Sequence, residues 1–164
     1  MQLRFEKENV IVTNVNLRRE NHGDEKKVAV DINFRAELAP KILDALTFGM
    51  NGSFEDFLYS KDHKKVTGLD AIKLATTFEH YIIELNYSVD DEQTKRFGDV
   101  KLCKFNLEPQ DGGLVEVSFQ AQIQSSVDDY LWCCKGYQYE QWELEVIGSS
   151  QKDLLDSEQA DAEE

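Results

Sequence analysis

The sequence lacks the features that would place the chain in a membrane or outside a cell. Its longest apolar runs are interrupted within a few residues, whereas a membrane-spanning helix needs about 20 apolar residues. No charged segment followed by an apolar stretch opens the chain, so we expect no secretory signal. Cysteine is scarce, and Cys103, Cys133 and Cys134 form an odd set that favours reduced thiols over disulfides. These absences predict a cytoplasmic protein.

The common catalytic and cofactor-binding motifs are also missing. The chain contains no phosphate-binding P-loop, no dinucleotide-binding glycine pattern, no nucleophile elbow and no zinc-protease helix. A zinc site built from Cys133, Cys134 and a histidine is disfavoured, because adjacent cysteines lack the spacing of chelating pairs. The carboxylate runs at 90–92 and 128–129 fit a loop and a helix N-terminus. We therefore expect a protein that is not an enzyme and holds neither a cofactor nor a metal ion.

What is present is an acidic chain of the size of one domain. It has 164 residues, of which 41% are hydrophobic, as in folded proteins, and a net charge of −14. The last fifteen residues carry six acids against one lysine and too few apolar side chains to offset the entropy of ordering them. We predict a single β-rich domain over residues 1–148 and a disordered acidic tail over residues 149–164.

The acidic tail has two interpretations. It serves as a solubilising terminus, or it competes for a basic groove or recruits a basic partner. In the second case the partner-binding residues are Asp153, Asp156, Glu158, Asp161, Glu163 and Glu164.

Alternating apolar and polar residues predict two antiparallel hairpins. The first joins residues 10–17 and 28–38 through a charged loop, and a break in the alternation indicates a bulge near Thr13 and Asn14. The second spans residues 100–124, with Pro109 ending one strand and a turn at Asp111-Gly112-Gly113. Its predicted inward-facing side chains include Cys103, Phe105, Leu107, Val115, Val117, Phe119, Ala121 and Ile123.

Three short helices are expected, beginning near Pro40, Ser53 and Ser126. In the third, Gly136 is expected to end the helix, and Cys133 is expected on its surface. The predicted buried face of this helix consists of Val127, Tyr130, Leu131 and Cys134.

The segment from 69 to 89 fits both helical and strand spacing. We predict a strand over 79–89, because aromatic and β-branched residues crowd it, and a helix remains the alternative. A closing strand is expected around Trp142, Leu144 and Val146. The sequence therefore predicts a mainly β (β-rich α+β) fold, an antiparallel sheet, barrel or sandwich of about six or seven strands with two or three short helices.

Basic side chains are the candidates for a nucleic-acid-binding site. They gather near one hairpin tip, in a second loop and along one strand beside aromatic residues, as in sheets that bind single strands. The alternative is a scatter of solvated lysines on an acidic surface, with the aromatic residues in the core. The candidates are Arg18, Arg19, Lys26, Lys27, Lys61, Lys64, Lys65, Lys101 and Lys104.

The segment 100–119, VKLCKFNLEPQDGGLVEVSF, precedes the expected third helix and closing strand. In this arrangement the chain resembles small proteins of bacteriophages and prophages that commonly lie among early genes for recombination and replication. The resemblance covers about the last two-thirds of the chain, and its most specific part is the hairpin. It implies a phage origin and a role inside the infected bacterial cell, and it assigns no functional residue.

Two functions are expected from these patterns. The first is a phage-encoded protein that binds single-stranded DNA or assists recombination and replication, with the acidic tail as a regulator. The alternative is an acidic inhibitor that mimics nucleic acid and binds a host defence protein or another nucleic-acid-binding protein. The expected partner is thus single-stranded DNA or a basic host or phage protein, and not a membrane. Self-association through edge strands is left open.

Overall fold

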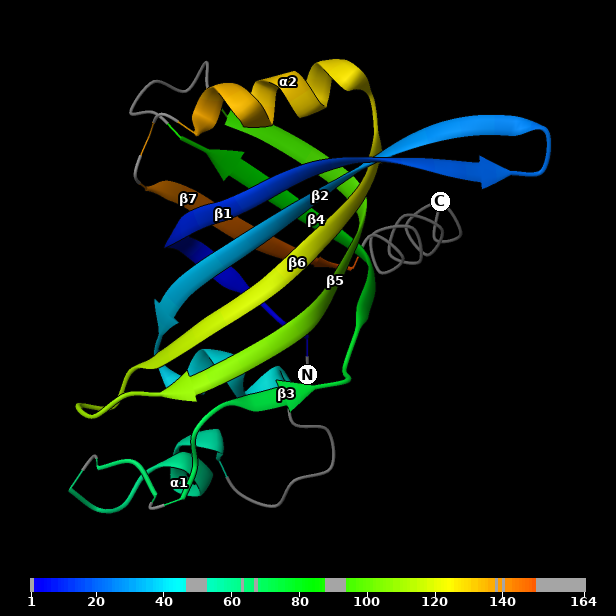
Figure 1. Ribbon diagram of the computed structural model, residues 1–164. Coiled ribbons are helices and arrows are strands. Elements are labelled where there is room, and N and C mark those ends of the chain that lie inside the picture. Colours follow the sequence, from blue (N-terminus) through cyan, green and yellow to red (C-terminus); the bar gives the residue numbers. More distant parts are fainter. Residues whose placement is uncertain are drawn as a thin grey trace, which may run out of the picture.

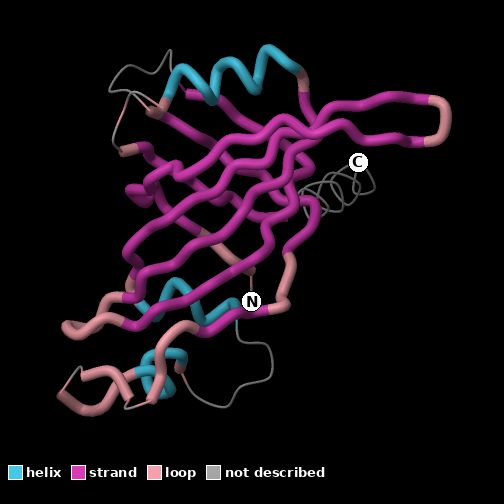
Figure 2. Tube along the Cα trace, viewed as in Figure 1, coloured by secondary structure: helices cyan, strands magenta, loops and turns pink. Residues whose placement is uncertain are grey.

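The computed structural model describes residues 2–46, 53–62, 64–66, 68–87, 94–137, 139 and 141–149. Strands dominate these residues, and short helices lie at two ends of the sheet (Figure 2). The elements in chain order are β1 (Phe5–His22), β2 (Glu25–Leu38), the 3₁₀ helix η1 (Pro40–Leu46), α1 (Phe54–Leu58), β3 (Ile72–Leu74), β4 (Phe78–Asn86), β5 (Thr94–Pro109), β6 (Val115–Ser125), α2 (Val127–Gly136) and β7 (Trp142–Ser149).

All seven strands belong to one antiparallel sheet, in the order β3-β5-β4-β7-β1-β2-β6. The long strand β5 changes neighbours along its length, because residues 94–102 pair with β4 and residues 101–109 pair with β6. The sheet therefore curls around its interior without clear closure into a barrel (Figure 1). This confirms the mainly β fold predicted from the sequence. The paired ends of β1 and β2 project beyond the other strands as an arm (Figure 1).

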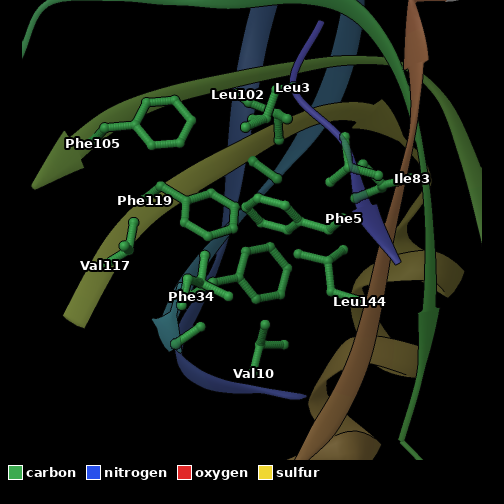
Figure 3. Packing of buried hydrophobic residues seen from close by; sticks show 14 of the residues in the cluster. Leu3, Phe5, Val10, Phe34, Ile83, Leu102, Phe105, Val117, Phe119 and Leu144 are labelled. Carbon is green, nitrogen blue, oxygen red and sulfur yellow. The ribbon is translucent and has the colours of Figure 1, made fainter. Parts of the chain in front are cut away.

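The hydrophobic core fills the inside of the curled sheet. Phe119 lies at its centre, with ring centroids 5.7 Å from Phe5, 5.3 Å from Phe34 and 5.3 Å from Phe105 (Figure 3). Phe105, Val117 and Phe119 are all buried, as predicted from strand alternation. Aromatic pairs at these separations contribute beyond the area that they bury, so this cluster holds strands from both halves of the chain together.

Both predicted hairpins are confirmed, but the charged loop predicted in the first is mostly strand, because β1 runs to His22 and β2 begins at Glu25. In the first, the β1–β2 register shifts between Val12 and Asn14, where the sequence alternation breaks. In the second, β5 ends at Pro109, and Gly112 and Gly113 have φ angles of 103° and 93°, which glycine adopts readily. Local turn and strand signals therefore located both hairpins.

Cys103 is buried as predicted, at 5% exposure, but it does not belong to the core cluster inside the sheet. A bulge interrupts β5, where Lys104 has a φ angle of 57° and the register with β6 shifts between Cys103 and Asn106. Because the bulge resets the alternation, Leu102 points into the core, and Cys103 lies opposite Gln120 on the outer face of the sheet.

The predicted buried face of α2 is wrong at Val127 and Leu131, whereas Tyr130 packs against the core as predicted. Ser126 caps the helix as expected, its hydroxyl accepting from the Asp129 N–H. Val127 and Leu131, however, are each 49% exposed, and the helix turns Cys133 and Gly136 towards the sheet. Cys133 is therefore the buried thiol and Cys134 the half-buried one, the reverse of the prediction.

Gly136 explains the orientation of α2. A Cβ atom at this position would lie 2.0 Å from Cζ2 of Trp142 and 2.7 Å from Cδ1 of Tyr87, so only glycine lets the helix approach these rings. Gly136 does not end the helix by a left-handed conformation; it is the last helical residue, and Tyr137 is the C-cap in a right-handed conformation. The helix thus ends at Gly136 as predicted, but the glycine is needed for packing against Trp142 and Tyr87 and not for a left-handed turn.

The ambiguous segment forms two strands, β3 and β4, which confirms the strand interpretation. Tyr81, Ile83, Leu85 and Tyr87 are buried. β4 lies between β5 and β7, where its side chains contribute to the core. Residues 88 and 89, which the prediction included, lie outside the described residues.

Candidate functional site

The nine basic candidates do not form one surface. They lie on the projecting arm, in the loop after α1 near the opposite end of the molecule, and within β5 (Figure 1): Arg18, Arg19, Lys26 and Lys27; Lys61, Lys64 and Lys65; Lys101 and Lys104. The structure brings two of them together, because Arg18 and Lys101 line the same shallow hollow of 250 Å³ on the outer face of the sheet.

Arg18 is held by carboxylates of neighbouring residues. Its Nε and Nη2 donate to the two oxygens of Asp31 at 3.0 and 3.1 Å, and its Nη1 donates to Glu20. The hydrogen bonds that Arg18 donates to the Asp31 carboxylate hold the pKa of Arg18 above its usual range. Hydrogen bonds from His22 and Gln124, together with Arg18, lower the pKa of Glu20 to about 2. The Arg18 guanidinium is therefore already bound by carboxylates of the same chain.

Two more basic candidates sit beside acids. Lys101 Nζ lies 3.4 Å from Glu79, and Lys27 Nζ lies 3.7 Å from Glu25. Such exposed pairs contribute little to stability, but each places a carboxylate where a phosphate would have to bind. These lysines therefore add little positive potential for a nucleic acid.

Aromatic side chains gather inside the sheet instead of on its outer face. Among the described residues, the aromatic side chains that are strongly exposed are Phe57, Tyr137 and Tyr139. Phe57 belongs to α1, and the two tyrosines follow α2. The outer face of the described strands thus presents no row of rings on which successive bases would stack.

Three glutamates form a row across neighbouring strands on the outer face of the sheet. Glu37 of β2 lies directly opposite Glu116 of β6, which lies directly opposite Glu108 of β5. Directly opposite like charges destabilise a sheet. Within the part of the chain that the structure describes, none of the three forms an ion pair, although Arg35 and Lys73 flank them. The glutamate row is therefore available to an external cation.

Three adjoining hollows form a composite groove that begins at this row. The first, of 440 Å³, is lined by Glu37 and Glu116 and shares Asn9 and Gln141 with the second. The second, of 350 Å³, is the tyrosine pocket, lined by Asn9, Asn86, Tyr87, Tyr139, Gln141, Trp142 and Glu143. The third, of 290 Å³, is lined by Lys7, Glu84, Leu85, Asn86, Thr94, Glu143 and Glu145.

The composite groove is predominantly acidic. Five glutamates line it against two basic residues, Arg35 and Lys7. Glu84 and Glu145 lie directly opposite each other across β4 and β7, and Arg96 approaches Glu84 at 3.8 Å. An extended segment with several positive charges would find carboxylates at both ends of the groove and aromatic rings in the middle.

Sequence reasoning missed this groove. Its glutamates do alternate with buried residues along β2, β6 and β7, which places them on an outer face. Their proximity depends on which strands pair and in which register, and neither is visible in any one segment. The acidic tail residues proposed as a partner site lie outside the described residues.

The three cysteines differ in burial, which predicts their reactivity. Burial raises the pKa of Cys133 to about 12 and also raises the pKa of Cys103. We expect iodoacetamide at pH 8 to modify Cys134 first in the native protein, at least about tenfold faster than the other two thiols. Mass spectrometry of digested samples measures this order. A Cys134→Ser variant should lose the fast phase, and labelling of Cys133 first would contradict the helix orientation.

Comparison with known proteins finds no relative, because no family model, curated protein or solved structure matches the chain. The resemblance to phage early-region proteins therefore stays a prediction. No helix in the described ranges is long and apolar enough to cross a membrane. In the same ranges, no group of three or more His, Cys, Asp or Glu side chains is placed to hold a metal ion.

Proposed function

We propose that this protein is a non-enzymatic binding protein that holds a basic segment of another protein in its composite groove. The observation that carries this proposal is the alignment of five glutamates along three adjoining hollows, with two of the pairs directly opposite each other across strands. Like charges at such positions repel in the free protein, and a cationic partner relieves that repulsion.

This proposal favours the second expectation from the sequence, an acidic inhibitor of a nucleic-acid-binding protein. Segments rich in arginine and lysine are those with which proteins contact phosphates, so a groove that attracts them competes with nucleic acid. The net charge of −14 adds long-range attraction for such a partner and repulsion for DNA. The basic side chains are dispersed, and Arg18, Lys27 and Lys101 pair with acids, so they offer less support for direct binding of single-stranded DNA.

A pair of charge-matched variants tests the groove. The groove variant carries Glu37→Gln, Glu116→Gln and Glu145→Gln, and the control carries Asp24→Asn, Glu25→Gln and Asp70→Asn at exposed positions outside it. Both remove three negative charges. Binding of a fluorescein-labelled arginine-rich peptide is followed by anisotropy. We expect the groove variant to lose about tenfold in affinity, because each exposed ion pair contributes about 0.2–1 kcal/mol and about 1.4 kcal/mol corresponds to tenfold.

The control variant should lose less than about twofold, and the wild-type affinity should fall as salt screens the charges. Equal losses in the two variants would show that net charge alone attracts the peptide and would overturn the groove as the site. A parallel titration uses a single-stranded oligonucleotide. Oligonucleotide binding with a steep salt dependence, unchanged in the groove variant, would favour the DNA-binding function instead.

A further inference from the structure

The tyrosine pocket in the middle of the groove has a wall of packed aromatic rings. Tyr139, 41% exposed, stacks on Tyr87 with a centroid separation of 5.2 Å and an interplanar angle of 24°. Tyr87 in turn lies 4.9 Å from Trp142 and 4.7 Å from Trp132, measured between ring centroids. Because Tyr87 and Trp142 are almost fully buried, they form a fixed floor, and Tyr139 is the ring that a ligand meets.

One backbone carbonyl orders this wall. The Gly136 carbonyl accepts a hydrogen bond from the Tyr139 N–H at 2.9 Å and another from Trp142 Nε1 at 3.2 Å. The side chain of Trp142 and the backbone at Tyr139 are thus anchored to the end of α2. A pocket formed in advance in this way loses less entropy when a ligand binds.

The polar lining of the pocket selects for positive charge. Glu143 supplies a carboxylate, and Asn9, Asn86 and Gln141 supply amide groups. Among the described residues, no lysine or arginine belongs to this lining, and Glu143 also faces the adjoining hollow that contains Glu84 and Glu145. An aromatic face attracts a cation through its quadrupole, and a carboxylate beside it strengthens that attraction.

The volume limits the size of the ligand. At 350 Å³ the pocket is at the small end of the range of about 300–1,000 Å³ that ligand sites occupy, which suits one long side chain. Arginine combines the required properties, since its guanidinium is planar, permanently charged, stacks on aromatic rings and binds carboxylates through several N–H donors. Both neighbouring hollows continue from the pocket, so a chain that carries the arginine can run on in either direction.

We propose that the tyrosine pocket binds one arginine side chain of the partner segment, with its guanidinium against the Tyr139 ring and paired with the Glu143 carboxylate. This rests on the proposed function, because it identifies the anchor of the basic segment. It also adds selectivity. The glutamates elsewhere in the groove attract any positive charge, whereas the pocket favours a group that is charged and also planar enough to stack on a ring, as a guanidinium is.

The protein carries its own reporters of the pocket. Its two tryptophans, Trp132 and Trp142, both belong to the aromatic cluster, and Trp142 lines the pocket. A titration of the full chain with N-acetyl-arginine amide is followed through the indole N–H resonances, and N-acetyl-citrulline amide serves as the neutral isostere. We expect a saturable shift of the Trp142 resonance with arginine and none with citrulline. No saturable shift, or the same shift with citrulline, would overturn the proposal.

Variants at the exposed ring separate stacking from folding. Tyr139→Ala should weaken binding of the arginine amide by about fivefold, and Tyr139→Phe, which keeps the ring, should retain the wild-type affinity. Glu143→Gln should weaken binding by about threefold, and Asp24→Asn, at the exposed tip of the arm, should leave it unchanged. If Tyr139→Phe binds as weakly as Tyr139→Ala, the ring face is not the contact, and the proposal is wrong.

The two proposals fail in different ways. If the arginine-rich peptide binds in the groove but Tyr139→Ala and Glu143→Gln leave its affinity unchanged, the pocket is not the anchor, and the proposed function stands. If the amide binds in the pocket but the groove variant binds the peptide as well as wild type, the pocket proposal stands, and the composite groove does not hold a basic segment.

Discussion

Replacement of Phe119 by alanine is expected to lower the free energy of unfolding by about 3–5 kcal/mol. The ring is 2% exposed and packs against Phe5, Phe34 and Phe105, which come from three other strands. Its removal loses the burial of the ring and leaves a cavity that these neighbours cannot fill without leaving their own positions. Urea denaturation followed by circular dichroism measures the change.

The matched control for this substitution is Phe57→Ala. Phe57 is 46% exposed on α1, so the same change of side chain there should cost less than about 1 kcal/mol. A loss below about 1 kcal/mol at Phe119 would place that ring outside the core and contradict the register of β6.

Substitution of Gly136 by alanine is expected to lower the free energy of unfolding by about 3 kcal/mol. The added methyl group would lie 2.0 Å from Cζ2 and 2.5 Å from Cη2 of Trp142, and Trp142 is 1% exposed and has no room to move away. Either α2 shifts off the sheet or the indole leaves its position. The same change should shift the indole N–H resonance of Trp142, because Nε1 donates to the Gly136 carbonyl.

Gly98→Ala is the control for the glycine substitution. A Cβ at Gly98 meets nothing within 4 Å, so alanine there should change stability by less than about 0.5 kcal/mol. A smaller ring in the Gly136→Ala background, introduced as Trp142→Phe, should cost less than Trp142→Phe does alone, because it relieves the clash. Equal stability of the Gly136→Ala and Gly98→Ala variants would show that α2 does not approach Trp142 as described.

The sequence predicted the helix α2 but not which of its faces is buried. The spacing of Val127, Tyr130, Leu131 and Cys134 predicts one buried face. Tyr130 does pack against the core, yet Val127 and Leu131 are half-exposed, and the helix turns Cys133 and Gly136 inward. Hydrophobicity alone favours the first face. Trp142 and Tyr87 decide for the second, because their rings fit only against a residue without a side chain.

The candidate functional site could be predicted from the sequence even less than the orientation of α2. The sequence does not show which basic residues are paired, and folding brings Asp31 to Arg18 on the arm and Glu79 to Lys101 on β5. Conversely, no sequence segment contains the composite groove, because its lining includes residues of β1, β2, β4, β5, β6 and β7. The acidic composition left a basic partner as one of two expectations, and only the strand pairing shows the acidic surface that we propose for it.

The sequence by itself determined the local elements: both hairpins, the bulge near Asn14, the glycine turn and the cap at Ser126. Each depends on residues adjacent in the chain, whose φ and ψ preferences and alternation act over a few positions. The tertiary structure decided the face of α2, the outward position of Cys103 and the row of glutamates across β2, β6 and β5. Those features depend on strand order, register and ring packing, which arise from contacts between distant segments and are absent from any local pattern.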